Sequence, residues 1–497
     1  MNKATESVNQ VKELCEKAYK AFKIYKKFSQ SQVDYIFQKT AEVAFKESER
    51  LARLAVNDTG FGKYEDKILK NQFGSKNVYE AYKDWKTVGI VCKDSRKKII
   101  EIAEPVGVVA ALIPSTNPTS TAIYKSLLAL KSGCALVCSP HPRAAKCILE
   151  AMEVVRKTAE EAGAPPNLLS TITIPTMEAI DELYKNQYTS LILATGGKPM
   201  VKSAYSSGKP AYGVGPGNVP AFIERSANID RAVQDIVKSK TFDYGTICAS
   251  EQAIVTETVV QQQVESALLR EGAYFVNERE QKKLEKLMVP KPGKLNPDIV
   301  GQPPSWIARK AGFNVPERTK VLVVKPGGVG RDYPLSIEKL SPVLAFYVEE
   351  DWKSGCERCI EILNYGGIGH TLSIHSENPE VILQFGLQKP AFRIVVNSPS
   401  THGAIGLSTA VNPAMTLGPG SVGGAITSDN ITPRHLINVK RLAFDIEKDL
   451  PLGMFDHEPS HEEEGIYGTG KLTASQLEKI RFGFLEKMGF VDRQKHY

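Results

Sequence analysis

Cys248 lies in surroundings typical of a nucleophile. It belongs to the string DYGTICASEQAIV, in which turn residues are followed by an apolar run typical of a strand. A thiolate held at such a loop-to-strand junction can attack a carbonyl carbon and form a covalent intermediate. The alternative is a buried cysteine that acts only as a small hydrophobic side chain, as most single cysteines do.

Three short apolar runs indicate the elements that position polar residues near such a nucleophile. They cover residues 106–113, 135–140 and 191–195, and each is followed by turn residues. Helical patterns lie between them, at 120–132, 144–161 and 177–185. This alternation predicts a doubly wound, parallel α/β sheet, which binds ligands at the carboxyl ends of its strands.

The rest of the chain divides around this sheet. Residues 5–85 show the spacing of amphipathic helices, and a second α/β block has strand patterns at 253–256, 319–324, 343–348 and 393–396. We therefore expect a first α/β domain at 1–224 and a second at 225–425, followed by a linker with an amphipathic helix at 446–497.

Composition and charge argue against a nucleic-acid-binding, membrane-spanning or secreted protein. The 497 residues carry a net charge of +7 without a dense basic block, so nucleic acid binding is not indicated. No run of apolar residues is long enough to span a membrane, and the first residues do not resemble a secretory signal. We expect a cytoplasmic enzyme with reduced cysteines and no metal site. The Cys356–Cys359 spacing would allow redox or metal chemistry, but it falls in a helical pattern.

Several motifs together resemble one family. The strings STNPT (115–119), PHPRA (140–144), ATGG (194–197), AYGVGPGN (211–218) and ICASEQ (247–252) occur in this order. In this the chain resembles the aldehyde dehydrogenase superfamily, and in detail its acylating, coenzyme-A-dependent branch. The resemblance runs from about residue 5 to 445 and implies two doubly wound α/β domains. It makes Cys248 the nucleophile and Asn117 a donor to the oxyanion; the alternative for Asn117 is a plain turn residue.

The resemblance also implies a nicotinamide cofactor, with NAD favoured and NADP as the alternative. Glu338 would hold the nicotinamide ribose, and the N-terminus of the helix after Gly196 and Gly197 could face the pyrophosphate. The complete cofactor-binding set is Ser115, Thr116, His141, Pro142, Arg143, Thr195, Gly196, Gly197, Val214, Gly215, Glu338 and Leu340.

Hydrolytic relatives have a water-activating glutamate about thirty residues before the cysteine. Here residues 196–223 contain neither Asp nor Glu. The resemblance therefore implies that coenzyme A, not water, removes the acyl group. His370, in a Gly-His-Thr string, would be a base for the coenzyme A thiol; the alternative is a hydrogen-bonded loop histidine.

The expected reaction is reversible conversion of a short aldehyde such as acetaldehyde or propionaldehyde to acyl-CoA. One alternative is an anionic aldehyde, sulfoacetaldehyde or succinate semialdehyde, with Arg393 as a candidate partner. A hydrolytic dehydrogenase and a non-catalytic scaffold are further alternatives. The resemblance also implies that 1–224 binds the cofactor, that 225–425 is the catalytic domain, and that 426–445 returns to the first domain as an oligomerisation segment. It implies a homodimer or homotetramer, with the strand pattern at 436–439 as the contributor. Residues 471–497 resemble peptides that target enzymes to bacterial microcompartments, so a shell or cargo protein is a candidate partner.

Overall fold

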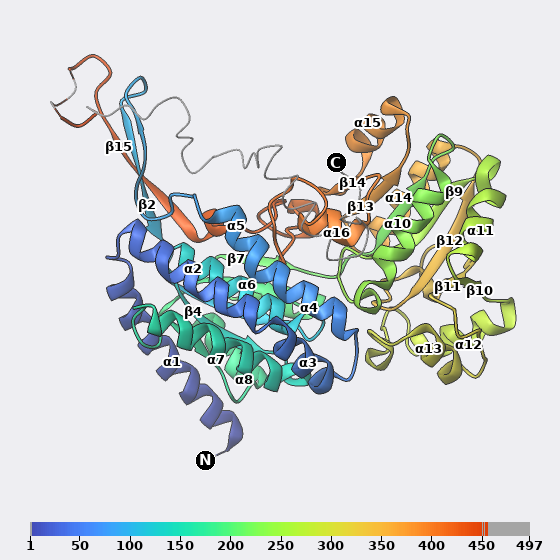
Figure 1. Cartoon of the computed structure of the whole chain (residues 1–497), viewed down its shortest axis with the longest axis horizontal. Helices are drawn as coiled ribbons and strands as arrows, with labels where there is room; N and C mark the ends of the chain where they lie inside the picture. The colour runs from blue at the N-terminus through green and yellow to red at the C-terminus, as the bar shows by residue number, and fades with distance from the viewer. Residues whose placement is uncertain (1, 450, 452, 456–497) are drawn as a thin grey trace, which may run out of the picture.

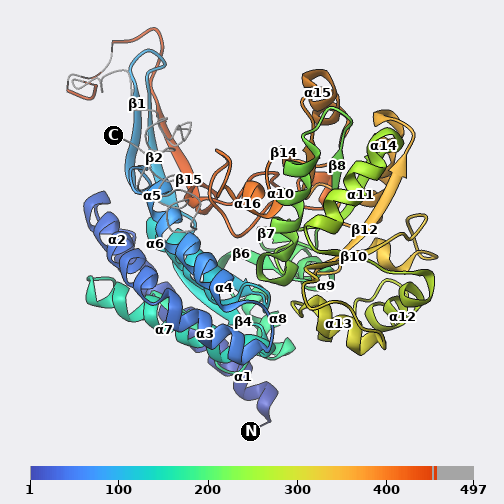
Figure 2. The same cartoon turned by 45° about the vertical axis from the view of Figure 1, so that its right-hand side comes forward.

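Two α/β bodies lie side by side, and a narrow three-stranded arm projects from the first of them (Figures 1 and 2). This architecture is that of a computed structural model, which describes residues 2–449, 451 and 453–455. The expected microcompartment peptide at 471–497, and most of the expected terminal segment at 446–497, lie outside the described residues.

The first body begins with a layer of helices. They are α1 (Lys3–Tyr25), α2 (Gln30–Lys46), α3 (Ser48–Thr59), α4 (Tyr64–Gln72) and α5 (Val78–Tyr82), with the π-helix η1 (Phe73–Asn77) between the last two. The apolar stripe predicted for 5–85 is buried, for example at Val11, Cys15 and Ala18 of α1. Ser29 begins α2 with a reciprocal capping box, which satisfies two free backbone groups.

A five-stranded parallel sheet forms the centre of this body. Its strand order is β5 (Leu169–Thr171), β4 (Ala135–Pro140), β3 (Val108–Ile113), β6 (Thr189–Thr195) and β7 (Ala211–Val214). The connecting helices are α6 (Pro118–Lys131), α7 (Ala145–Glu161), α8 (Met177–Lys185) and α9 (Lys198–Tyr205). The strand order reverses between β3 and β6, so the loops after these two strands diverge and leave a ligand-binding crevice there.

The second body contains a seven-stranded parallel sheet. Its order is β10 (Ala273–Phe275), β11 (Val321–Val324), β12 (Val343–Glu349), β9 (Glu251–Glu257), β8 (Val219–Ile223), β13 (Leu372–His375) and β14 (Ile394–Val396). Its helices are α10 (Ile229–Thr241), α11 (Gln261–Arg270), α12 (Glu278–Met288), α13 (Pro304–Ala311), α14 (Trp352–Tyr365), α15 (Pro379–Gln388) and α16 (Ser400–Ile405). Alternate residues of β9 belong to two separate hydrophobic clusters, because successive side chains face opposite sides of a sheet.

The arm consists of β1 (Gly89–Asp94), β2 (Ile99–Pro105) and β15 (Ile437–Ala443). All three strands are antiparallel, and β15 pairs with β2 along its whole length. The returning segment predicted at 426–445 thus joins the first body through the arm.

The predicted fold class is confirmed: both large sheets are parallel and have helices between their strands. The change from one sheet to the other falls between β7 and β8, at 215–218, earlier than the boundary expected at 224. Among the described residues, no helix is long and apolar enough to cross a membrane.

Candidate active site

The candidate residues come from opposite ends of the two sheets. Ser115, Thr116 and Asn117 follow the carboxyl end of β3, as expected for a ligand site on a parallel sheet. The catalytic candidates of the second body instead lie in loops that lead into the amino ends of its strands. Gly217 precedes β8, Cys248 precedes β9, Glu338 precedes β12, His370 precedes β13 and Arg393 precedes β14.

The loops around Cys248 are packed very closely. A Cβ atom at residue 217 would lie 2.3 Å from the carbonyl oxygen of Cys248 and 3.1 Å from Nδ1 of His370. Glycine is therefore required at 217, and the three loops of Gly217, Cys248 and His370 meet at one point. Cys248 itself is only partly buried and packs against the hydrophobic core of the first body.

The thiol of Cys248 is protonated in this resting state. Burial raises its pKa to about 12, and the negative charge of Glu338 acts in the same direction. Three groups lower the pKa of this thiol in part: the guanidinium of Arg393 and the backbone N–H groups of Cys248 and Ala249. The same backbone donors can stabilise an oxyanion that forms next to the sulfur.

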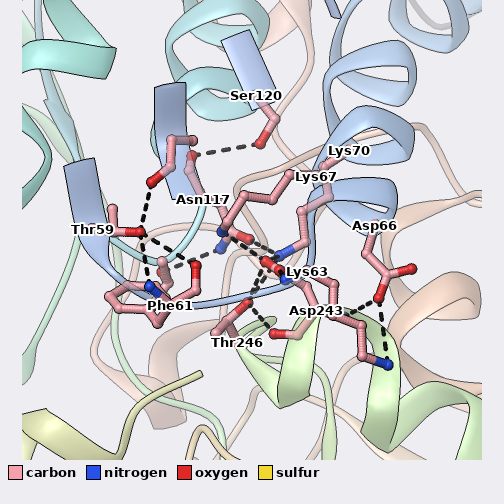
Figure 3. A network of polar contacts seen from close by, with 12 residues as sticks. Thr59, Phe61, Lys63, Asp66, Lys67, Lys70, Asn117, Ser120, Asp243 and Thr246 are labelled. Carbon is pink, nitrogen blue, oxygen red and sulfur yellow. Dashed lines mark hydrogen bonds and ion pairs between the residues drawn. The ribbon is translucent and has the colours of Figure 1, made fainter. Parts of the chain in front are cut away.

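Asn117 lies at the N-cap position of α6, and its side chain is held by two neighbours. Its Oδ1 accepts a hydrogen bond from Nζ of Lys70 at 2.7 Å, and its Nδ2 donates to Oγ1 of Thr116 at 3.2 Å. Figure 3 shows Lys70 between Asn117 and the loop that carries Asp243 and Thr246. The amide is therefore fixed in one orientation, with its nitrogen turned away from Lys70.

Glu338 lies beside Cys248 and is positioned by its own loop. Its Oε1 accepts a hydrogen bond from the backbone N–H of Gly217 at 2.9 Å, and burial raises its pKa to about 7. Leu340, which belongs to the predicted cofactor set, has a φ of 43°, a left-handed conformation that is rare for a leucine. Its carbonyl accepts a hydrogen bond from the N–H of Gly301, which stabilises this turn.

His370 is brought to the site but is fully enclosed. Its Nδ1 lies 2.9 Å from Oγ1 of Thr371, and its Nε2 is buried without a hydrogen-bond partner in the protein. Burial, together with the nearby charge of Arg393, lowers the pKa of His370 to about 3. The imidazole is therefore neutral, and in this closed state it is a weak base for a thiol.

Arg393 is anchored to the backbone. Its guanidinium donates to the carbonyl oxygens of His370, Gly418 and Ser428 at 2.9, 2.6 and 2.8 Å. These bonds occupy the two terminal nitrogens of the guanidinium and help to keep a cation buried near Cys248, whereas its Nε is buried without a hydrogen-bond partner in the protein.

Apart from Glu338 and Leu340, the predicted cofactor-binding residues lie at the carboxyl edge of the five-stranded sheet. His141, Pro142 and Arg143 are exposed after β4, whereas Val214 is buried at the end of β7 and Gly215 follows it half-buried. Thr195 ends β6, Gly196 follows it, and Gly197 is the N-cap residue of α9. Pro199 has no N–H and the N–H of Met200 bonds to the carbonyl of Gly197, so this helix end offers an anion fewer N–H groups than most helix starts do. Arg143 forms an exposed ion pair with Asp298 at 2.8 Å.

Sequence reasoning did not identify Lys70 or Asp243 as part of the site. Both are buried and charged, and burial of charged side chains requires specific partners. Lys67 and Lys70 lie three residues apart in an amphipathic helix, and such a pattern predicts exposed lysines. Their burial follows only from the contact between α4 and the loop before β9.

The remaining cysteines belong to the structure of the domains. Cys356 and Cys359 are buried in α14, and Cys356 contacts Nζ of Lys389. Within the described residues, no group of three or more His, Cys, Asp or Glu side chains is arranged to hold a metal ion.

Comparison with known proteins identifies the family. Residues 2–279 match the aldehyde dehydrogenase family, and an acetylating aldehyde dehydrogenase from Geobacillus thermoglucosidasius is 51% identical, with a TM-score of 0.88. That alignment covers 90% of this chain and 99% of the other. The chain therefore belongs to the aldehyde dehydrogenase family, in its acylating branch.

Other relatives extend this comparison. The bifunctional aldehyde-alcohol dehydrogenase of Escherichia coli is 43% identical over 88% of this chain, which spans only 50% of that protein. A Rhodopseudomonas palustris propionaldehyde dehydrogenase, solved with bound CoA and an acylated cysteine, is 26% identical with a TM-score of 0.78. That alignment covers 87% of this chain and 97% of the other. A similar fold, with 27% identity and a TM-score of 0.78, occurs in a propionaldehyde dehydrogenase of a Clostridium phytofermentans microcompartment; it covers 86% of this chain and 96% of that one.

Proposed function

We propose that the protein converts a short-chain aldehyde, NAD and coenzyme A into acyl-CoA and NADH, reversibly, through a thioester on Cys248. The observation that carries this proposal is the set of contacts around Cys248: Gly217 packs against its carbonyl and bonds to Glu338, and Lys70 bonds to both Asn117 and Thr246 of the loop before Cys248. The upstream segment 196–223 supplies no acidic side chain that could activate water. The acylated cysteine and bound CoA of the Rhodopseudomonas relative support the same chemistry.

The first half of the reaction takes place at the sulfur. The thiolate of Cys248 attacks the aldehyde carbon, and the carbonyl oxygen becomes a thiohemiacetal oxyanion. The free N–H of Asn117 and the backbone N–H of Cys248 would donate to this oxygen, at a contribution of roughly 3 kcal/mol per donor. Because the resting thiol has a raised pKa, it must lose its proton when the substrates bind.

The second half transfers the acyl group. A bound nicotinamide would supply the hydride acceptor for the thiohemiacetal, and loss of the hydride would leave an acyl thioester on Cys248. The thiol of coenzyme A then attacks this thioester, loses its proton, and expels the thiolate of Cys248. His370 remains a candidate acceptor for that proton, on the condition that opening of its surroundings raises its pKa from about 3.

The first body provides suitable groups for a dinucleotide. The divergent loops after β3 and β6 are the usual place for such a cofactor, and the positive end of the α9 dipole favours a pyrophosphate there. Glu338 offers a carboxylate for ribose hydroxyls. Arg143 is paired with Asp298, which favours NAD because the guanidinium is not free for a 2′-phosphate.

NADH formation tests the proposal directly. We expect turnover of acetaldehyde or propionaldehyde only in the presence of coenzyme A, loss of activity in Cys248→Ala, and a fall in kcat of about 100- to 1,000-fold in Asn117→Ala. Cys92→Ala is the matched control, because Cys92 is a partly buried thiol on the arm. Equal rates with and without coenzyme A would instead identify a hydrolytic enzyme.

The finer assignments are part of the same proposal. An anionic aldehyde is the alternative substrate: the terminal nitrogens of Arg393 are held by backbone carbonyls, so only its buried Nε is left to contact such an anion. We propose a homo-oligomer built through the arm, with the cofactor-binding and catalytic bodies as its two domains. A microcompartment location rests on the residues 471–497 and on the origin of one relative. The intact site argues against a scaffold without activity.

A further inference from the structure

The ammonium group of Lys70 joins the two halves of the proposed oxyanion site. It donates to Oδ1 of Asn117 at 2.7 Å, to Oγ1 of Thr246 at 2.9 Å and to Oδ2 of Asp243 (Figure 3). An ammonium has three N–H donors and no acceptor, so all of its hydrogen-bonding capacity is used by these three partners. Thr246 and Asp243 lie in the loop of Cys248, whereas Asn117 belongs to the other body.

This arrangement decides which way the Asn117 amide points. Because Lys70 can only donate, the oxygen of the amide must face it and the nitrogen must face away. One N–H of that nitrogen is directed to Thr116, and the other remains for a ligand. With a neutral side chain at position 70 that can both donate and accept, the amide could also adopt the reversed orientation.

The loop of Cys248 depends on the same cluster. Asp243 and Tyr244 have φ values of 48° and 52°, a left-handed conformation that costs about 1 kcal/mol or more for each non-glycine residue. Asp243 is fully buried and accepts from the N–H of Lys63 and from Lys67, while its own N–H donates to Asp66. These bonds hold the unusual turn five residues before the cysteine.

The position of Lys70 itself is also rigid. The helix changes from α to π at η1, directly after α4, and a Cβ on Gly74 would lie 2.8 Å from the carbonyl oxygen of Ser120 in α6. Asn71 accepts a hydrogen bond from Thr119 of α6 at 2.7 Å. The helix that carries Lys70 is therefore pressed against the helix that Asn117 begins, and π-turns of this kind often occur at functional sites.

We propose that Lys70 is a positioning residue of the oxyanion site, fixing the Asn117 amide and linking it to the loop of Cys248. This inference rests on the proposed function of Asn117 and Cys248. Burial lowers the pKa of Lys70 to about 8, and Asp243 opposes this change, so the lysine is mainly charged at neutral pH. Burial alone would raise the pKa of Asp243, but Lys67 and Lys70 lower it, so the carboxylate is ionised.

The test is a double-mutant cycle with CoA-dependent NADH formation from acetaldehyde as the readout. Lys70→Met keeps the length of the side chain but removes its donors, and we expect kcat to fall about 10- to 100-fold with little change in the KM values for NAD and coenzyme A. In an Asn117→Ala background, the same substitution should change kcat by less than about threefold, since there is no amide left to orient.

Lys67→Met is the matched control. Lys67 is equally buried and also pairs with Asp243 at 2.9 Å, but it forms no bond with Asn117. We expect a comparable fall in thermal stability and a much smaller fall in kcat. Equal losses of kcat in the two lysine variants would overturn the proposal, because the cluster would then act only by stabilising the loop.

Two further outcomes separate the possible failures. If Lys70→Met lowers kcat by the same factor with and without Asn117, Lys70 does not act through the amide and the inference is wrong. If Asn117→Ala or Cys248→Ala retains wild-type turnover, the proposed function itself is wrong. Should methionine at 70 prevent folding, Lys70→Gln tests the same coupling, because it keeps a polar group beside Asp243 while allowing the amide to reverse.

Discussion

The resting thiol of Cys248 is a poor nucleophile, and this has a measurable consequence. Burial raises its pKa to about 12, with Glu338 as the next contribution in the same direction. Above pH 7 Glu338 itself becomes ionised, since its own pKa is about 7. We therefore expect the alkylation rate of Cys248 by iodoacetamide to rise about tenfold per pH unit between pH 8 and 10, without a plateau.

Removal of the Glu338 charge should make this thiol more acidic. Glu338→Gln is expected to increase the alkylation rate at pH 8.5 by about 3- to 10-fold, although it should weaken turnover with NAD. Glu361→Gln, a change at an exposed carboxylate of α14, serves as the control and should leave the rate as it is. A plateau below pH 9 in the wild type would contradict the raised pKa.

For single residues, the sequence motifs indicated which side chains are candidates for the site, but not how deeply each is buried or what it contacts. Gly217 lies against both Cys248 and Glu338, and Lys70 links Asn117 to the loop before Cys248, while the catalytic and binding roles of these residues stay proposals. The enclosure of His370 was not predictable, because it arises from Gly217 and Arg393, which lie in loops distant in the sequence. Lys70 was missed for the same reason: its partner Asn117 is 47 residues away.

At the scale of elements, the first residue of β9 is a fully buried glutamate, Glu251, and burial of a carboxylate costs free energy of folding. Glu251 accepts the N–H of Ser400 through Oε1 at 2.9 Å, while Oε2 is buried without a partner in the protein. Burial raises the pKa of Glu251 to about 7. Because the pKa of Glu251 is higher in the folded than in the unfolded protein, its contribution to the free energy of unfolding is fully present below the unfolded pKa. That contribution is lost as the pH rises through the folded pKa of about 7.

Glu251→Gln should therefore stabilise the protein in alkali and not in acid. We expect an increase in the free energy of unfolding of about 1–3 kcal/mol at pH 8 and almost none at pH 4, followed by thermal denaturation at both values. CoA-dependent activity should persist in this variant. Loss of activity together with unchanged stability would show that Glu251 is an acid or base of the reaction and not a residue that supports the loop.

Secondary structure was largely predictable from the sequence. The apolar runs at 106–113, 135–140 and 191–195 correspond to β3, β4 and β6, because fully buried parallel strands need uninterrupted apolar residues. Which end of a strand faces the site was not predictable for the second sheet. Its catalytic candidates lie at amino ends, an arrangement that follows from the way the two bodies meet and not from either body alone.

At the scale of the whole molecule, the two bodies are joined at the site itself. The chain passes from β7 to β8 through 215–218, and Gly217 in this connection touches both Cys248 and Glu338. The domain boundary expected at 224 stays a proposal, because the sequence of β8 is compatible with a strand in either sheet. Only its pairing with β9 and β13 assigns it to the second sheet.

The arm has the features of an assembly element. In the described part of the chain, β15 is an edge strand: it pairs with β2 on one side, and most of its residues are exposed. Leu442 on β15 and Ile90 on β1 are 45% and 52% exposed. Lys440 and Arg441 of β15 pair with Glu104 and Glu101 of β2, so exposed apolar side chains remain on an edge strand that could pair with another chain, and we propose that a homo-oligomer forms here.

Leu442→Asp is expected to dissociate this oligomer, because the new carboxylate would have to be buried without a partner. A cost of this kind raises the dissociation constant about 100-fold or more, which light scattering coupled to size exclusion at micromolar protein would detect as a smaller particle. Leu269→Asp on α11 is the control, since Leu269 is also exposed but lies far from the arm in the fold. An identical mass for the wild type and both variants would place the interface elsewhere and leave the exposed edge of β15 without a function in assembly.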